Sequence, residues 1–156
     1  MLDETQAAIA RILAAKGFPD AADRARRARS VMDAAFEEAT VRDFDDFLSV
    51  GAGLPDPKDV HVVAAALKIR ATTIVTDNLR DFPAAILAPL NIEARSPDAF
   101  IADTIALDPG KAVAALKRMR ERFRKPEMTP ERLLLEMEFA GLTEAVDVLR
   151  PHVRSL

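Results

Sequence analysis

Residues 54–83, which read LPDPKDVHVVAAALKIRATTIVTDNLRDFP, decide the fold that this sequence predicts. Asp56 before Pro57 pairs a good helix cap with a good first helical residue. Apolar residues then recur at helical spacing, at Val60, Val63, Ala64 and Leu67. Residues 72–76 are β-branched throughout, which is typical of a buried strand. The stretch therefore predicts a helix that ends near Arg70, followed by a strand.

The polar residues at the ends of this helix and strand should meet. About 13 helical residues at 1.5 Å each and about six strand residues at 3.3 Å each both span roughly 20 Å. Because only one or two residues separate the two elements, the strand runs back alongside the helix. We therefore expect Asp59 to lie near three polar residues at the strand's carboxyl end, Thr76, Asn78 and Asp81. In α/β sheets this is the end that binds ligands.

Each of these polar residues also has a structural explanation. Asp56 and Asp59 both suit the first turn of a helix, and Asn78 suits a turn. Asp81 can cap a short helical turn, and Thr76 can be the last strand residue. Taken singly, these explanations are favoured, but the gathering of the residues at one sheet edge favours a site. Its oxygen ligands would suit Mg²⁺ or Mn²⁺.

Composition narrows the class of protein. The 156 residues are enough for one ordinary core, and 49% are hydrophobic without an apolar run that approaches a membrane span. No secretory leader precedes them, so we expect a cytoplasmic protein. The absence of cysteine excludes disulfides and zinc–sulfur sites, and His61 and His152 are too few for a zinc site. The net charge of −3 argues against a protein that coats nucleic acid.

The same segment resembles the PIN-domain proteins, which include the VapC-type toxins of toxin–antitoxin pairs. Asp59 with the run Val63–Ala66 fits the family's helix motif, D-x-h-x-A-A-A. The family's next strand ends T-x-[D/N]-x-x-D-F, and four residues fit that motif: Thr76, Asn78, Asp81 and Phe82. Glu4 resembles the acidic position of an early helix in the family.

The resemblance implies a metal-dependent ribonuclease. It implies that four residues are catalytic and hold Mg²⁺ or Mn²⁺: Glu4, Asp59, Asn78 and Asp81. Asn78 and Asp81 would be ligands or water positioners, and Thr76 would position the substrate. The implied partners are an RNA substrate, an antitoxin protein and a second copy of the chain. The alternative function is a degenerate PIN-like module that binds a partner without catalysis.

The sequence departs from the family at its start. PIN domains begin with a strand that carries their first catalytic Asp, whereas this sequence starts at the Glu helix. We expect an α/β, PIN-like three-layer fold over residues 1–96, with a short parallel sheet that is incomplete at the N-terminus. Its strands are expected near 39–43, 72–76 and 91–94. A rearranged sheet, a second copy of the chain, or residues upstream of Met1 would each fill the gap.

An incomplete sheet leaves exposed strand edges, and such edges pair with other chains. We therefore expect a homodimer or higher even oligomer, with the helix near Leu2–Leu13 at or beside the interface.

The rest of the sequence predicts helices. A first helix should end at Gly17, and a second should start at Asp20 and bury Ala28, Val31, Met32, Ala35 and Phe36. Residues 97–156 predict a helical C-terminal extension of four short helices, because capping residues precede prolines in Ser96-Pro97, Asp108-Pro109 and Thr129-Pro130. Basic residues crowd 117–125, which usually marks a solvated face; the alternative is a surface that tracks RNA phosphates.

Overall fold

The computed structural model describes residues 2–124 and 126–156, without the side chains of Leu2, Glu4 and Glu38. Contacts between Cα atoms divide the chain into two compact units, Met1–Asp43 and Phe44–Leu156. Among the described residues, no helix combines the length and apolar character that crossing a membrane requires.

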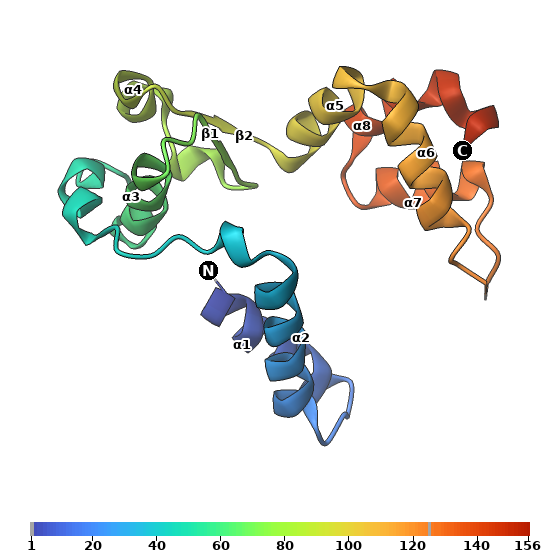
Figure 1. Ribbon diagram of the computed structural model, residues 1–156, viewed down its shortest axis with the longest axis horizontal. Coiled ribbons are helices and arrows are strands. Elements are labelled where there is room, and N and C mark those ends of the chain that lie inside the picture. The colour runs from blue at the N-terminus through green and yellow to red at the C-terminus, as the bar shows by residue number, and fades with distance from the viewer. Residues whose placement is uncertain (1, 125) are drawn as a thin grey trace. The chain divides into compact units, whose positions relative to one another are not determined.

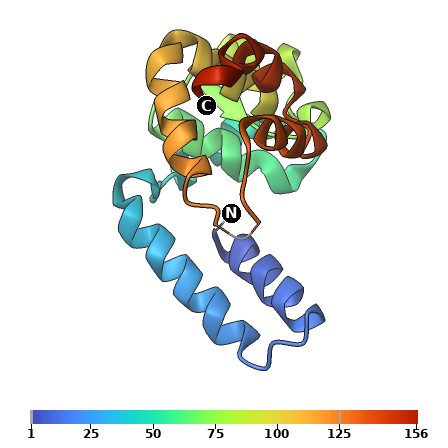
Figure 2. The same ribbon diagram turned by 90° about the vertical axis from the view of Figure 1, so that its right-hand side faces the viewer.

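The first unit is a pair of helices packed side by side, α1 (Leu2–Ala15) and α2 (Ala21–Ala35) (Figure 2). Gly17 follows α1 with a φ of +79°, so the predicted glycine stop is confirmed. The predicted buried face of α2 is wrong: its buried residues are Ala21 and Ala25, whereas Val31 is 63% exposed. Small alanines allow close approach of the two helices nearer the start of α2.

The strand predicted near 39–43 is also wrong. A 3₁₀ turn, Glu37–Ala39, follows α2, and no strand follows that turn among the described residues before Phe44. Asp43 has a φ of +54°, in the left-handed region that extended strands do not occupy. β-Propensity at Thr40 and Val41 was therefore not enough to form a strand without a neighbouring one.

The second unit contains a two-stranded parallel sheet (Figure 1). The short turns Asp45–Gly51 and Pro57–Asp59 lead into α3 (Val60–Lys68). Strand β1 (Thr73–Val75) pairs in parallel with β2 (Glu93–Arg95), with Ile74 opposite Ala94. Between the strands lie the 3₁₀ turn Leu79–Asp81, helix α4 (Ala84–Leu87) and the 3₁₀ turn Ala88–Leu90.

The helix and both strands of this segment share one apolar core. Helix α3 ends where Arg70 adopts a φ of +56°, and the Ala71 amide donates to the Ala66 carbonyl at 2.8 Å. This tight ending turns the chain back so that β1 runs beside α3. The core buries Leu54, Val63, Ala66, Ile74, Phe82, Leu87 and Ile92. The helix–strand return predicted from 54–83 is thus confirmed, although the first predicted helical residues form the 3₁₀ turn Pro57–Asp59 and α3 ends two residues before Arg70.

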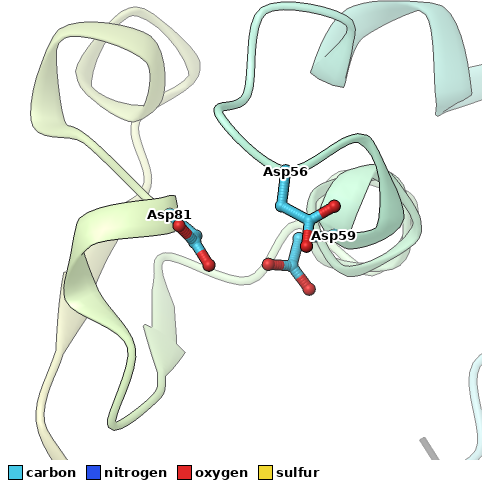
Figure 3. Close-up of side chains that lie close together, drawn as sticks. All are labelled: Asp56, Asp59 and Asp81. Atoms are coloured by element: carbon cyan, nitrogen blue, oxygen red, sulfur yellow. The ribbon is translucent and has the colours of Figure 1, made fainter.

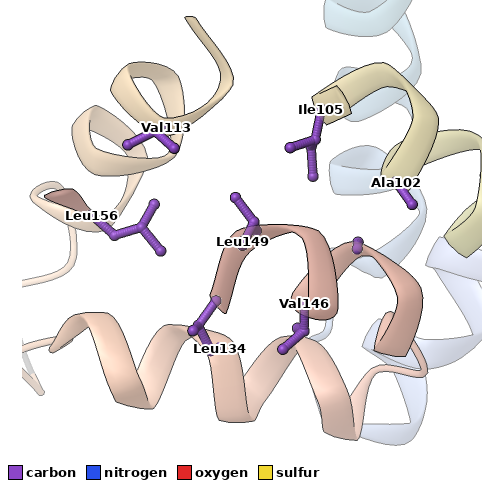
Figure 4. Packing of buried hydrophobic residues seen from close by; sticks show 8 residues of the cluster. Ala102, Ile105, Val113, Leu134, Val146, Leu149 and Leu156 are labelled. Carbon is purple, nitrogen blue, oxygen red and sulfur yellow. The ribbon is translucent and has the colours of Figure 1, made fainter. Parts of the chain in front are cut away.

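Four helices follow β2: α5 (Pro97–Leu107), α6 (Pro109–Arg120), α7 (Pro130–Phe139) and α8 (Thr143–Leu149), with a last 3₁₀ segment, Arg150–Ser155. The three predicted caps are confirmed, because Ser96, Asp108 and Thr129 each accept a hydrogen bond from a first-turn amide. Figure 4 shows the shared core, which buries Ala102, Ile105, Val113, Leu134, Ala145, Val146, Leu149 and Leu156.

Helix α8 takes its cap from another helix. Its N-cap residue, Leu142, has no side-chain oxygen. Asp98 of α5 accepts hydrogen bonds from the amides of Glu144 at 2.8 Å and Ala145 at 2.9 Å, and from the Thr143 hydroxyl at 3.2 Å. Thr143 is the first residue of α8 and not its N-cap residue. Asp98 therefore accepts the hydrogen bonds that an N-cap side chain would otherwise accept from the first amides of α8.

The predicted fold class, α/β with a short parallel sheet and a helical C-terminal region, is confirmed. The division of the chain into domains 1–96 and 97–156 stays a prediction. Separate apolar clusters lie on the two sides of residue 96, whereas contacts between Cα atoms divide the chain after Asp43.

Candidate metal centre

Two carboxylates of the candidate site come from the turn that opens α3. Asp56 caps this turn, and its Oδ1 accepts a hydrogen bond from the Lys58 amide at 2.9 Å. The Asp59 amide donates to the Asp56 carbonyl at 3.0 Å, which fixes one complete turn between the two residues. Asp59 is the N-cap residue of α3 but makes no side-chain capping hydrogen bond. Helix capping therefore explains Asp56 and does not explain Asp59.

The third carboxylate, Asp81, lies in the turn that follows β1. The Asn78 amide donates to the Thr76 hydroxyl at 3.1 Å, and the Asp81 amide donates to the Asn78 carbonyl at 3.3 Å. The side-chain amide of Asn78 also donates to the Asp81 carboxylate. Phe82, only 5% exposed, anchors the end of this turn in the apolar core. The Asp81 carboxylate is thus held by Asn78 on one side of the turn, and the buried Phe82 fixes the other side.

The two turns bring the three carboxylates together. Oxygens of Asp56, Asp59 and Asp81, one from each residue, all lie within 4.8 Å of one another, and each residue is partly buried. Figure 3 shows Asp81 pointing toward Asp56 and Asp59 from the opposite segment. The predicted proximity of Asp59 and Asp81 is present in this geometry. It follows from the return of β1 beside α3.

The chemistry of these donors fits a hard divalent cation. Mg²⁺ binds oxygens at about 2.0–2.1 Å, so ligands on opposite sides of the ion lie about 4.2 Å apart. The three carboxylate oxygens lie within 4.8 Å of one another, close to this largest spacing between two ligands of one ion. Three like charges at this spacing repel one another, and a divalent cation offsets that repulsion. The group is therefore a candidate site for Mg²⁺ or Mn²⁺.

Of the other residues predicted for the site, Asn78 and Thr76 lie beside the carboxylate group, and Glu4 lies in the first unit. Asn78 contacts Asp81 directly, and the Thr76 hydroxyl supports the turn through the Asn78 amide. Glu4 lies on α1 in the first unit, and its side chain is outside the described residues, so its role stays a prediction. His61 lies in the first turn of α3, and its Nδ1 donates to the Lys58 carbonyl at 2.6 Å.

Sequence reasoning did not include Asp56 among the candidate ligands. Its place before Pro57 indicated a cap, and the structure bears out that role. The missed signal was the spacing of Asp56 and Asp59, because residues three apart in a helical turn lie on one face. A capping carboxylate uses one oxygen for the amide and keeps acceptor capacity for a second partner.

Two comparisons with known proteins find similarity to VapC-like proteins. A family model described as the VapC50 C-terminal domain matches residues 97–151. A protein of Mycobacterium tuberculosis (strain ATCC 25618 / H37Rv), named "Putative ribonuclease VapC50", is 42% identical to this chain over 77 residues. Both matches are to VapC-like proteins, which the sequence resembles in its motif as well. The 77 matched residues are 49% of this chain and 46% of that relative, so the chain spans about half of the relative's length. No solved structure matches significantly.

The family model covers the helical region that follows β2, residues 97–151. The resemblance seen in the motif of residues 59–82 is thereby confirmed from a different part of the chain.

Proposed function

We propose that this chain is a ribonuclease that hydrolyses RNA phosphodiester bonds with the help of Mg²⁺ or Mn²⁺. The observation that carries the proposal is the convergence of Asp56, Asp59 and Asp81 at the end of β1. The similarity to the protein named "Putative ribonuclease VapC50" also supports it. Both favour catalysis over a degenerate binding module.

In this proposal Asp59 and Asp81 are metal ligands, and Asp56 adds a third carboxylate. A bound divalent ion lowers the pKa of its water and neutralises charge on the phosphate. Asn78 orients Asp81 through its side-chain amide, and Thr76 keeps that turn in shape. The carboxylates stay partly exposed, so a phosphate can approach the edge of the sheet.

The proposal extends to partners on the family resemblance alone. We propose that the chain acts in the cytoplasm, where its RNA substrate is found, as the toxin of a toxin–antitoxin pair. An antitoxin protein would then be its inhibitor, and the active form would be a homodimer. Sedimentation at micromolar concentration tests the dimer, and a monomer peak alone would contradict it.

The metal assignment is tested with Mn²⁺ alone and then with RNA. Asp59→Asn and Asp81→Asn each remove one charged ligand with little change of shape. We expect each to weaken Mn²⁺ binding by at least about tenfold in calorimetry and to abolish Mn²⁺-dependent cleavage of single-stranded RNA. Asp77→Asn is the matched control, because Asp77 lies in the same turn but outside the carboxylate group. Equal metal binding and cleavage by all three variants would remove the assignment.

A further inference from the structure

The segment from α6 to the turn after it carries charge of one sign. Residues 109–125 contain seven lysines and arginines and one glutamate, a net charge of +6. The remaining residues contain fifteen basic and twenty-four acidic side chains, a net charge of −9. A concentration of positive charge on an otherwise acidic protein creates a local potential that attracts polyanions.

Not all of these basic residues are available to a ligand. Arg120 is structural: its Nε donates to the Leu156 carbonyl at 2.9 Å and its guanidinium donates to the Met128 carbonyl at 2.8 Å. Lys111 pairs with Asp108 at 3.0 Å, at the other end of α6. Lys125 lies outside the described residues.

Four exposed cations remain: Lys117, Arg118, Arg122 and Arg124. Among the described residues, none of them has a carboxylate within ion-pair distance, whereas Arg24, Arg26, Arg132 and Arg150 each have one. Attraction to the carboxyl end of a helix explains cations in its last turn. It does not explain Arg122 and Arg124, which follow the last residue of α6.

The turn that carries the last two arginines is ordered by backbone contacts. The Arg122 amide donates to the Met119 carbonyl at 3.1 Å. The backbone of Arg124 pairs with that of Glu127 in an isolated antiparallel β-bridge. Phe123 lies between the two arginines and is 49% exposed. An exposed aromatic ring beside guanidinium groups gives a nucleic-acid base a surface on which to stack, whereas the carboxylates of an acidic peptide do not stack on a ring.

We propose that Lys117, Arg118, Arg122 and Arg124 form a binding surface for the phosphate backbone of single-stranded RNA, with Phe123 available to a base. We call these four residues the α6 basic surface; α6 is labelled in Figure 1. The inference rests on the proposed ribonuclease function, and it adds a contact to RNA away from the carboxylates. Guanidinium groups bind phosphate oxygens in pairs, which suits three arginines to this task.

The test measures RNA binding without cleavage. A labelled oligouridylate is titrated with the full chain in EDTA, and its fluorescence anisotropy gives the dissociation constant over a range of salt concentrations. Each phosphate contact on a single strand contributes about 0.7 to the slope of log affinity against log salt. Four contacts contribute about 2.8, so a fourfold rise in salt weakens them about 50-fold.

Replacement of the α6 basic surface by glutamine (K117Q/R118Q/R122Q/R124Q) should weaken RNA binding by about tenfold or more and flatten the salt slope by about 3. The control, R24Q/R26Q/R132Q/R150Q, removes the same charge from arginines that are paired with carboxylates. It should stay within about threefold of the wild type, because surface ion pairs contribute little. The charge-conserving variant K117R/R118K/R122K/R124K should restore most of the binding.

Three results would overturn the inference. The wild type would fail to bind RNA in EDTA, or the two glutamine variants would bind equally well, or poly-aspartate of equal charge would compete as well as RNA. The last result would identify a site for an acidic protein. Failure here is separable from failure of the proposed function. If Asp59→Asn abolishes cleavage while the glutamine variant of the α6 basic surface binds RNA like the wild type, the ribonuclease stands without this surface.

Discussion

Replacement of Asp98 by alanine should release the N-terminus of α8. The Asp98 carboxylate accepts three hydrogen bonds from α8, two from amides and one from the Thr143 hydroxyl. Loss of a helix cap costs about 0.5–2 kcal/mol, and hydrogen bonds to a charged group lie at the upper end of that range. Because the carboxylate is partly exposed, we expect about 1–2 kcal/mol.

In a chain of this length each kcal/mol shifts the unfolding midpoint by about 2–4 °C, so Asp98→Ala should lower it by about 2–8 °C. Two compact units need not unfold together, so a local measurement is also needed. Hydrogen exchange at the amides of Glu144 and Ala145 should become faster in the variant, since those amides lose their acceptor. The matched control is Asp147→Ala: Asp147 is an exposed residue of α8 that only pairs with Arg150 at 3.5 Å.

The effect should depend on pH in one direction. Desolvation raises the pKa of Asp98, but the hydrogen bonds from α8 outweigh it and hold that pKa below its ordinary value of 3.8. The unfolded carboxyl therefore takes up its proton first as the pH falls. The contribution of Asp98 is fully present above about pH 4 and is lost as the pH falls through the lower, folded pKa. A stability difference between wild type and Asp98→Ala that persists unchanged in strong acid would refute this reasoning, as would unchanged exchange at Glu144 and Ala145.

Two further predictions concern the turn that carries Asp81. Asn78→Ala removes the amide that orients the Asp81 carboxylate, and it should weaken Mn²⁺ binding about tenfold in calorimetry, whereas Asp77→Ala should change it little. Phe82→Ala opens a cavity beneath the same turn and should cost about 3–5 kcal/mol in urea unfolding, because Phe82 is 5% exposed. Phe100, at 43% exposure, provides the control, and a loss for Phe100→Ala as large as that for Phe82→Ala would contradict the prediction.

The sequence predicted those parts of the molecule whose causes are local. Prolines after capping residues mark the starts of α5, α6 and α7, and each cap bonds within its own first turn. The return of β1 beside α3 followed from two element lengths and a short connection. Local patterns also identified Asp59, Asn78 and Asp81, because they sit at the ends of those elements.

The sequence did not predict features that depend on partners distant in the chain. The run Thr40–Asp43 has strand-forming residues but no neighbouring strand, and it is irregular. Asp98 lies in the first turn of α5, yet its carboxylate caps a helix more than forty residues later. The apolar residues at the end of α2 are exposed, whereas the buried residues of that helix are Ala21 and Ala25. The spacing of apolar residues within one segment does not show which distant segment that segment contacts.

The three carboxylates of the candidate metal centre also couple ion binding to the folded state. Asp56 and Asp59 belong to one segment and Asp81 to another, so the group exists only after β1 has returned beside α3. A cation that binds this group binds the unfolded chain far less well, and it therefore stabilises the fold by mass action. At a hundredfold excess over its dissociation constant, the gain is about 2.7 kcal/mol. The melting temperature of the protein thus becomes a measure of which divalent ion it prefers, whether or not any RNA is present.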